Sequence, residues 1–225
     1  KIKWEYDNSE HEANLSLGFG KYQAEAFQNK SLLSLWKASV FSSLRSKYKI
    51  WNAKSPLLPE NVLHRYSPIK IVPSLNFKTE LSTSYFVYEN SNSQALFNIA
   101  LGPEIIFGNF HRAFLDYTRI SIMPGITIKD GSSPFEFDNN IDLKTLKMEL
   151  DQQLYGPIVL SSGFKFNIDS DSSNYGKSLE SKIAILYQRR AYDIGLFYQP
   201  YQKAGGIMIN LNGFDYNGAG KPFYK

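Results

Sequence analysis

The sequence predicts an all-β fold, namely an antiparallel transmembrane β-barrel of about 12 strands, or the C-terminal portion of a larger barrel. Apolar and polar residues alternate with a period of two along many segments, as they do on the two faces of a strand. Many of these segments reach the ~9–11 residues that a tilted membrane strand needs, whereas ordinary strands average ~5–6 residues. The chain is also rich in aromatic residues, with 16 Phe and 15 Tyr, and only 20% of its residues are charged.

The first part of the chain gives a mixed signal. Residues 31–51 carry Trp36, Val40 and Leu44 at helical spacing, yet the second half of this segment alternates as a strand does. We favour two strands here over a basic amphipathic helix, which would suit a membrane surface. Residues 52–67 contain prolines that break regular structure, so they are predicted to form the main internal loop.

The later segments alternate more regularly and are predicted to be strands of one barrel domain that spans residues 1–225. Within residues 158–169, Leu160 and Phe164 lie on one side, whereas Lys165 and Asn167 lie on the other. A soluble β-sandwich turns its apolar side toward a core, and a membrane barrel turns it toward lipid. Strand length and low charge favour the barrel. The residues that we expect to face lipid are Leu160, Phe164, Ile183 and Ile185.

Aromatic residues lie near many predicted strand ends, where the interfacial girdles of a membrane barrel are found. From Lys129 onward the connections also alternate between long and short, as in outer-membrane barrels. We therefore expect residues 132–140 and 169–177 to lie outside the cell and residues 155–157 to face the periplasm. The expected girdle residues are Tyr85, Tyr88, Phe107, Tyr117, Tyr155, Tyr187, Tyr192 and Tyr198.

Composition excludes several classes of function. The chain has no Cys, so it has no disulfide framework, thiolate nucleophile or Cys-based zinc site. Its formal charge of +4 comes from Lys and Arg that interleave with acidic residues, which is not the basic cluster of a nucleic-acid-binding protein. No run approaches the ~20 apolar residues of a transmembrane helix. Because the chain begins at Lys1 without an apolar signal region, we interpret it as a piece of a longer precursor.

No residue pattern supports catalysis, a metal site or a cofactor. His11, His64 and His111 are far apart, and no G-x-S-x-G motif occurs, so we predict that the chain is not an enzyme. Arg112 and Asp116 are expected to share a face in a salt-bridged strand end or turn. Residues 168–174 offer oxygen ligands but lack the glycine and glutamate of an EF-hand, so a solvated loop is expected there.

Polar side chains of adjacent late strands are predicted to meet on the face that lines the lumen. They form either a plain mixed-charge wall or a wall that holds the polar part of a ligand. These lumen-facing candidates are Lys165, Asn167, Glu180, Lys182 and Asp193.

Several segments in the same order resemble a cyanobacterial family of outer-membrane barrels that is similar to the lipopolysaccharide-assembly (LptD-like, organic solvent tolerance) protein. The resemblance runs from His64 to Phe223 and is weaker over residues 1–63. Its motifs are HRYSPIKIVP from His64, GNFHRAFLDYT from Gly108, SPFEFD from Ser133, QQLYGP from Gln152, YQRRAY from Tyr187 and NGFDYNGAGKPF from Asn212.

The resemblance implies an outer-membrane location and a role in export or assembly of lipopolysaccharide or a related envelope lipid. It also implies membrane lipids, this amphiphile, and periplasmic transport and barrel-assembly proteins as partners, whereas the charge distribution argues against nucleic acid. A porin-like channel and a soluble carbohydrate-binding β-sandwich are the main alternatives, and an outer-membrane hydrolase is a weaker one. Since a Gly- and Pro-containing tail follows the last predicted strand, residues 206–214, we expect a weak seam there through which lipid leaves sideways.

Overall fold

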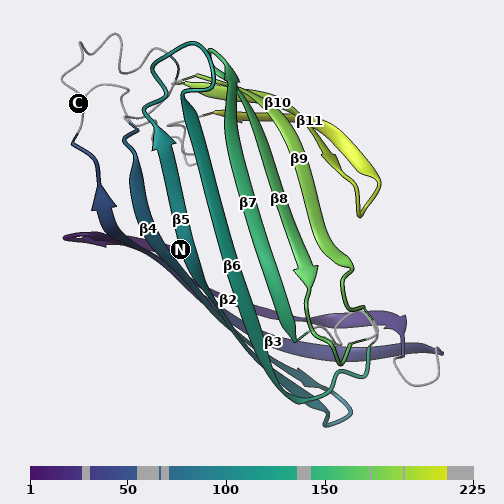
Figure 1. The fold of residues 1–225 in the computed structure, drawn as a ribbon. Coiled ribbons are helices and arrows are strands. Elements are labelled where there is room, and N and C mark those ends of the chain that lie inside the picture. Colours follow the sequence, from purple (N-terminus) through teal and green to yellow (C-terminus); the bar gives the residue numbers. More distant parts are fainter. Residues whose placement is uncertain are drawn as a thin grey trace.

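The described residues form one β-sheet of eleven strands in sequential order (Figure 1). This computed structural model describes residues 1–26, 31–54, 66, 71–135, 143–172, 174–189 and 191–211. Each strand pairs antiparallel with the next one along the chain, so the predicted all-β, antiparallel class is confirmed. The strands are β1 (Ile2–Tyr6), β2 (Ser9–Glu25), β3 (Leu32–Asn52), β4 (Ser74–Tyr88), β5 (Ser93–Gly108), β6 (Tyr117–Gly131), β7 (Lys144–Tyr155), β8 (Ile158–Asn167), β9 (Ser178–Gln188), β10 (Tyr192–Gln199) and β11 (Ala204–Leu211).

The sheet is not closed into a complete barrel within the described ranges. There, β1 pairs only with β2, and β11 pairs only with β10. Strand β11 ends at Leu211, so the last part of the predicted strand over residues 206–214 lies outside the described residues. In the part of the chain that the structure describes, no helix is long and apolar enough to cross a membrane.

Strand β3 corrects the expectation for residues 31–51. Neither two strands nor an amphipathic helix forms there, because Leu32–Asn52 is one strand of 21 residues. It pairs with β2 on one edge and with β4 on the other, and hydrogen bonds along both edges override the local helical spacing. The predicted internal loop begins after Asn52, and most of residues 52–67 lie outside the described ranges.

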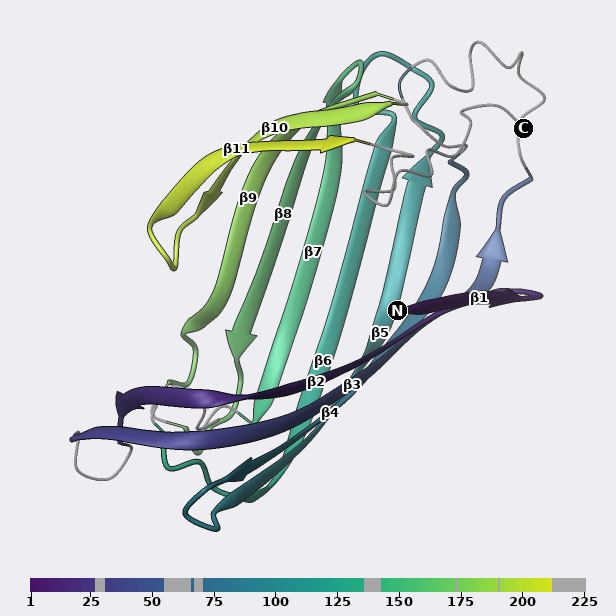
Figure 2. The ribbon, with the colours of Figure 1, turned by 180° about the vertical axis from the view of Figure 1, so that it is seen from behind.

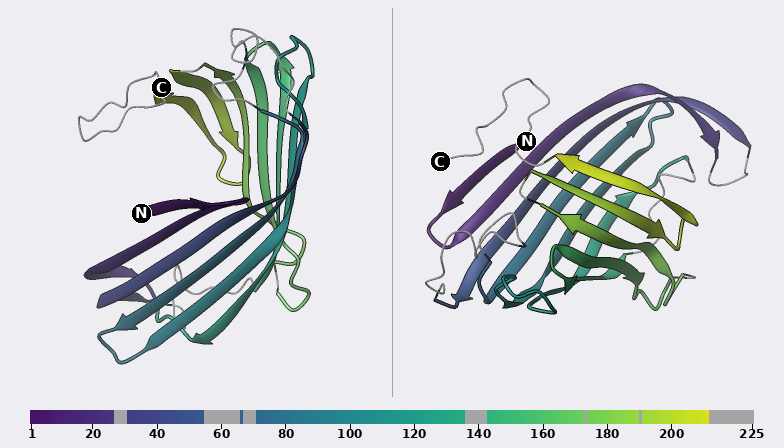
Figure 3. Two further views of the ribbon diagram at one scale, coloured as in Figure 1. Left: turned by 90° about the vertical axis from the view of Figure 1, so that its left-hand side faces the viewer. Right: turned by 90° about the horizontal axis from the view of Figure 1, so that it is seen from above.

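The sheet curls strongly, so that β2 and β3 run at a large angle to β8 and β9 (Figure 2 and Figure 3). The pairing of β5 with β6 is interrupted near the middle of both strands. Pro103 and Pro124, which lack a backbone N–H, fall within this interruption. A Cβ atom on Gly102 would lie 1.9 Å from the carbonyl oxygen of Ile122, so glycine permits the close approach of the two strands.

The two faces of the sheet differ in chemistry. We call the concave side, which carries Glu104, the inner face, and the opposite side the outer face. Large apolar side chains cover the outer face and stay solvent-exposed, up to 75% for Leu17 and Phe19. Other exposed members of this surface are Leu15, Val40, Tyr85, Phe97, Leu101, Phe107, Ile122, Ile126, Ile128, Ile183, Ile185, Ile194, Leu196, Ile207 and Ile209. Leu160 and Phe164 lie on the same face by register.

The connections divide between two ends of the sheet. The long connections after β6 and β8 lie at one end, which we call the long-loop end. The short turns after β7 and β9 lie at the other, the short-turn end, so the long–short alternation expected from Lys129 onward is present. However, the connection between β3 and β4, residues 53–73, also belongs to the short-turn end.

Small apolar clusters cover the inner face near both ends. At the short-turn end, Phe110 and Tyr117 pack with Val159. At the long-loop end, Tyr88 contacts Phe135, with 5.9 Å between ring centroids. Tyr88 and Tyr117, expected in the interfacial girdles, are therefore buried on the inner face. The other six expected girdle residues lie on the outer face near strand ends.

Candidate functional site on the inner face

Ten charged side chains form a connected network on the inner face of β2–β7, and we call this network the ionic belt. Strand alternation brings every second residue to this face, so successive strands contribute charges at a similar height. The belt contains five cations and five carboxylates and is therefore electrically balanced. Its members are Glu12, Arg45, Lys47, Lys78, Glu80, Glu104, Arg119, Lys147, Glu149 and Asp151.

Glu104 is the most buried carboxylate of the belt, with a side chain that is 2% exposed. Its oxygens lie 2.9 Å from Lys47 Nζ and 3.0 Å from Arg119 Nη1, and they also pair with Lys78. Asn76 Nδ2 donates a further hydrogen bond of 3.3 Å to Oε1. Burying a carboxylate is costly unless it is paired and hydrogen-bonded, and these four partners offset that cost.

Arg119 joins three carboxylates through its guanidinium group. Nε and Nη2 lie 2.7 and 2.6 Å from the same oxygen, Oδ2 of Asp151. Nη1 faces Glu104 and, at 3.3 Å, Glu149 Oε2. The planar donor fork of Arg suits this arrangement better than the point charge of Lys would.

Two ion pairs of the belt cross the concavity of the sheet. Lys147 Nζ on β7 lies 3.5 Å from Glu80 Oε1 on β4, and Lys78 Nζ on β4 lies 3.7 Å from Glu149 Oε2 on β7. In a flat sheet, strands three positions apart are separated by roughly 14 Å. Long Lys and Glu side chains on the concave side of the curled sheet span this separation.

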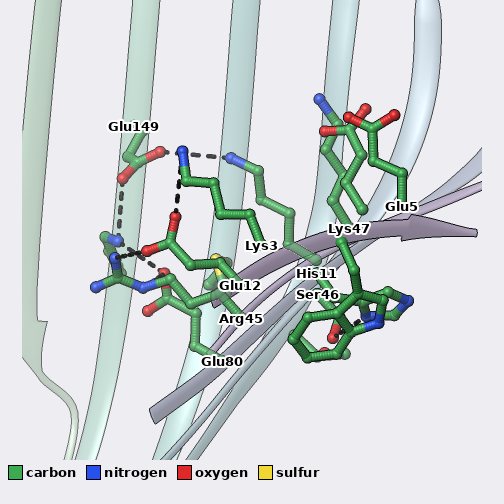
Figure 4. Close-up of a pocket in the computed structure, with 15 residues that line it drawn as sticks. Lys3, Glu5, His11, Glu12, Arg45, Ser46, Lys47, Glu80 and Glu149 are labelled. Atoms are coloured by element: carbon green, nitrogen blue, oxygen red, sulfur yellow. Dashed lines mark hydrogen bonds and ion pairs between the residues drawn. The ribbon is translucent and has the colours of Figure 1, made fainter. Parts of the chain in front are cut away.

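The N-terminal side of the belt borders a cavity of about 340 Å³ (Figure 4). Glu12 Oε1 lies 2.9 Å from Lys1 Nζ and 3.9 Å from Arg45 Nη1, and Lys3 pairs with its other oxygen at 3.7 Å. Figure 4 shows Glu12, Arg45 and Glu149 on the same side of this cavity. Cations and carboxylates alternate around it, so the cavity does not select a strongly charged ligand of either sign.

The family model described as "Protein of unknown function (DUF3769)" matches residues 1–215. The chain belongs to the DUF3769 family. No curated protein and no solved structure matches it. The family match includes residues 1–63.

The five predicted lumen residues of this DUF3769 chain all lie on the inner face by register, but they do not form one group. Lys165 Nζ lies 3.5 Å from Glu180 Oε1, and Lys182 is two residues further along β9. Asn167 is fully buried and accepts a hydrogen bond from the Asp169 amide, which orders the connection after β8. Asp193 lies near the short-turn end, at the start of β10.

The predicted Arg112 and Asp116 motif forms a turn, with contacts that differ from those expected. Asp116 Oδ2 accepts hydrogen bonds from the backbone amides of His111 and Arg112, at 3.0 and 3.1 Å. Among the described residues, the side chain of Arg112 does not form an ion pair with Asp116. His111 Nδ1 instead lies 3.3 Å from Asp116 Oδ2 without hydrogen-bond geometry, because the segment is a turn and strand alternation does not apply. Gln153 anchors this turn by accepting from the Asp116 amide.

The acidic and histidine residues of this DUF3769 chain are spread over its described ranges. There, no three His, Asp or Glu residues gather in a geometry that would hold a metal ion. The acidic segment after β8 is an ordered loop, in which Asp169 pairs with Lys144 at 3.3 Å. Partial burial raises the pKa of Asp169, but hydrogen bonds from Lys144 and from backbone amides outweigh it and hold that pKa below its usual range.

The alternation of apolar and polar residues puts Lys78, Glu104, Lys147, Glu149 and Asp151 on the polar sides of their strands, but it does not show that they meet. The sequence does indicate that these charges share one face, since each of them falls on the polar side of an alternating segment. The strand order and the curl, which decide which charges meet, were not available from the alternation.

Proposed function

We propose that the chain forms part of the wall of an outer-membrane β-barrel that exports or assembles lipopolysaccharide or a related envelope lipid. The observation that carries the membrane part of this proposal is the apolar outer face, which lies opposite an inner face with an ionic belt on β2–β7. Exposed apolar surface of this extent would cause aggregation in water unless lipid or a partner covers it. Lipid covers such a face in a transmembrane barrel.

Strand dimensions support the same proposal. Strands β2 to β6 have 15 to 21 residues, which exceeds the length that crosses a bilayer with tilt. Phe107 and Tyr155 near the short-turn end, and Tyr85 and Tyr198 near the long-loop end, occupy positions that suit two interfacial girdles. A soluble β-sandwich needs two packed sheets, whereas the described strands form a single sheet.

The inner face favours lipid export as the function, rather than passage of small solutes through a wide channel. Ion pairs between Glu80 and Lys147 and between Lys78 and Glu149 cross the concavity, so side chains occupy the space that a porin leaves to water. The identity of the exported lipid rests only on the resemblance to lipopolysaccharide-assembly barrels. An amphiphile would keep its polar part on the inner face while its apolar part leaves between strands.

Membrane fractionation of the full-length protein tests the location. We expect the protein in the outer-membrane fraction, released by detergent and retained after washing with high salt or carbonate. Recovery in a soluble fraction would contradict the proposal.

Depletion of the protein in living cells tests the export role. We expect lipopolysaccharide or the related lipid to accumulate in the inner envelope while its surface amount falls. Unchanged surface lipid together with slower uptake of small solutes would favour the porin-like alternative.

A further inference from the structure

The inner face of β8–β11 differs from the ionic belt because it combines a cation with an apolar surface. Two adjoining cavities, of about 290 and 270 Å³, lie there and are both lined by Gly163 and Lys182. Ala184, Leu186 and Met208 line the first cavity together with Arg119 and Glu149 of the belt, and Lys147, Lys165 and Glu180 line the second. We call the combined depression the Lys182 groove.

Lys182 is the distinctive charge of this groove. Other inner-face lysines nearby have carboxylate partners, at 3.1 Å for Lys147 with Glu149 and 3.5 Å for Lys165 with Glu180. Among the described residues, Lys182 has no carboxylate within 4.0 Å. Its Nζ instead lies 3.9 Å from Met208 Sδ and 5.3 Å from the ring centroid of Phe197. The ammonium group therefore retains its capacity for an anionic partner.

Two features make room for a ligand beside this ammonium group. Gly163 faces Lys182 across β8 and β9, and a Cβ atom there would have no other atom within 4 Å. A strand glycine with open space above it lets a ligand approach the backbone. Next to it, Ala184 and Leu186 carry the apolar surface away from the charge, along the same face of β9.

We propose that the Lys182 groove binds an anionic amphiphile, with the anionic group at Lys182 and the start of an acyl chain against Ala184, Leu186 and Met208. The inference rests on the proposed export function and assigns its cargo contact to one place. The balanced belt does not provide such a contact, because its cations already have carboxylate partners. Within the groove, Lys182 borders the apolar surface of Ala184, Leu186 and Met208, whereas Arg119 and Glu149, which line the same cavity, pair with each other.

Binding to the full-length protein in a neutral maltoside detergent tests the proposal, with native mass spectrometry as the readout. Lysophosphatidylglycerol is the anionic probe, and lysophosphatidylcholine is the zwitterionic control with the same chain. We expect tighter binding of the anionic probe by the wild type, a comparison that needs no variant. Equal affinity for the two lipids would overturn the proposal.

Variants then locate the contact. Lys182→Gln should weaken lysophosphatidylglycerol binding by about tenfold or more, because a charge-assisted contact is lost. Lys182→Arg should retain most of the binding, Gly163→Leu should block it, and Lys21→Gln on the outer face should not change it. Unchanged binding by a folded Lys182→Gln protein would refute the site. Competition by inorganic phosphate at equal concentration would show that the groove takes the free anion and not an amphiphile.

The binding measurements and the depletion experiment can refute the Lys182 groove and the export function independently of each other. Loss of surface lipid on depletion with normal binding by Lys182→Gln would leave export standing and remove the groove. Specific lysolipid binding with unchanged surface lipid would keep the groove and remove export.

Discussion

Glu104 is the residue on which most of the ionic belt depends. Four partners surround its buried side chain, and three of them are cations. Replacing it with an uncharged residue leaves Lys47, Lys78 and Arg119 close together without the carboxylate between them. Removal of one partner from a buried ion pair costs about 3–5 kcal/mol.

We therefore expect Glu104→Gln to lower the free energy of unfolding by about 3 kcal/mol. Glu180→Gln is the matched control, because Glu180 is an inner-face carboxylate with a 72% exposed side chain. That control should leave stability nearly unchanged, since exposed pairs contribute little. Reversible guanidinium unfolding in lipid vesicles measures both variants. Equal effects of the two substitutions would show that the belt does not stabilise the fold.

Asp169 makes the stability of the connection after β8 depend on pH. Because its pKa is held below the usual value of 3.8, its contribution is complete above that value and is lost as pH falls through the lower, folded-state pKa. We expect pepsin to cleave residues 168–177 increasingly as pH falls below about 4. Asp169→Asn should be cleaved to the same extent across the range. A wild-type loop that stays protected down to pH 2 would argue against this role.

At the scale of the strand, the close approach of β5 and β6 at Gly102 depends on the absence of a side chain. Gly102→Ala places a Cβ atom against the Ile122 carbonyl oxygen, and we expect a loss of about 1–3 kcal/mol in unfolding free energy. Gly163→Ala provides the control, since a Cβ atom there meets nothing within 4 Å. Thermal unfolding in detergent compares the two. A tolerated Gly102→Ala would mean that the strands can separate without loss of stability.

The two faces of one strand should respond differently to the same charge. On β5, Ile99 lies on the outer face and Asn98 on the inner face beside a cavity of about 290 Å³. We expect Ile99→Arg to cost about 2–4 kcal/mol in a lipid bilayer and Asn98→Arg to cost much less. Unfolding in vesicles provides the measurement. A larger cost at Asn98 would reverse the assignment of the lipid-facing side.

Strand alternation was enough to predict the all-β class and the two faces of most strands, but it was ambiguous at β3. Trp36, Val40 and Leu44 are four residues apart, and this spacing keeps side chains on one side of both a helix and a strand. Pairing with β2 and β4 resolved the ambiguity, and such long-range pairing is not encoded in a local window. The belt was also beyond prediction, because the pair between Lys78 on β4 and Glu149 on β7 joins strands that are not neighbours in the sheet.

At the scale of the whole molecule, the two ends of the sheet should lie on opposite sides of the membrane. We expect the long-loop end to be outside the cell, so a cysteine at Tyr175, which is exposed in the connection after β8, should react with an impermeant maleimide in intact cells. A cysteine at Arg112, at the short-turn end, should react only after lysis. The chain contains no native Cys, so labelling is specific. Labelling of Arg112→Cys alone in intact cells would invert the topology.

Strand direction constrains how the open wall can be completed. In an antiparallel meander of eleven strands, the first and the last run the same way, so β1 and β11 could meet only as parallel neighbours. A second copy inserted in the same orientation would bring β11 against β1 with the same mismatch. Bacterial single-chain barrels have even strand numbers and antiparallel pairing throughout. Antiparallel closure of this sheet therefore requires an odd number of additional strands between β11 and β1. A segment that contributes an even number of strands could not close the barrel with antiparallel pairing throughout.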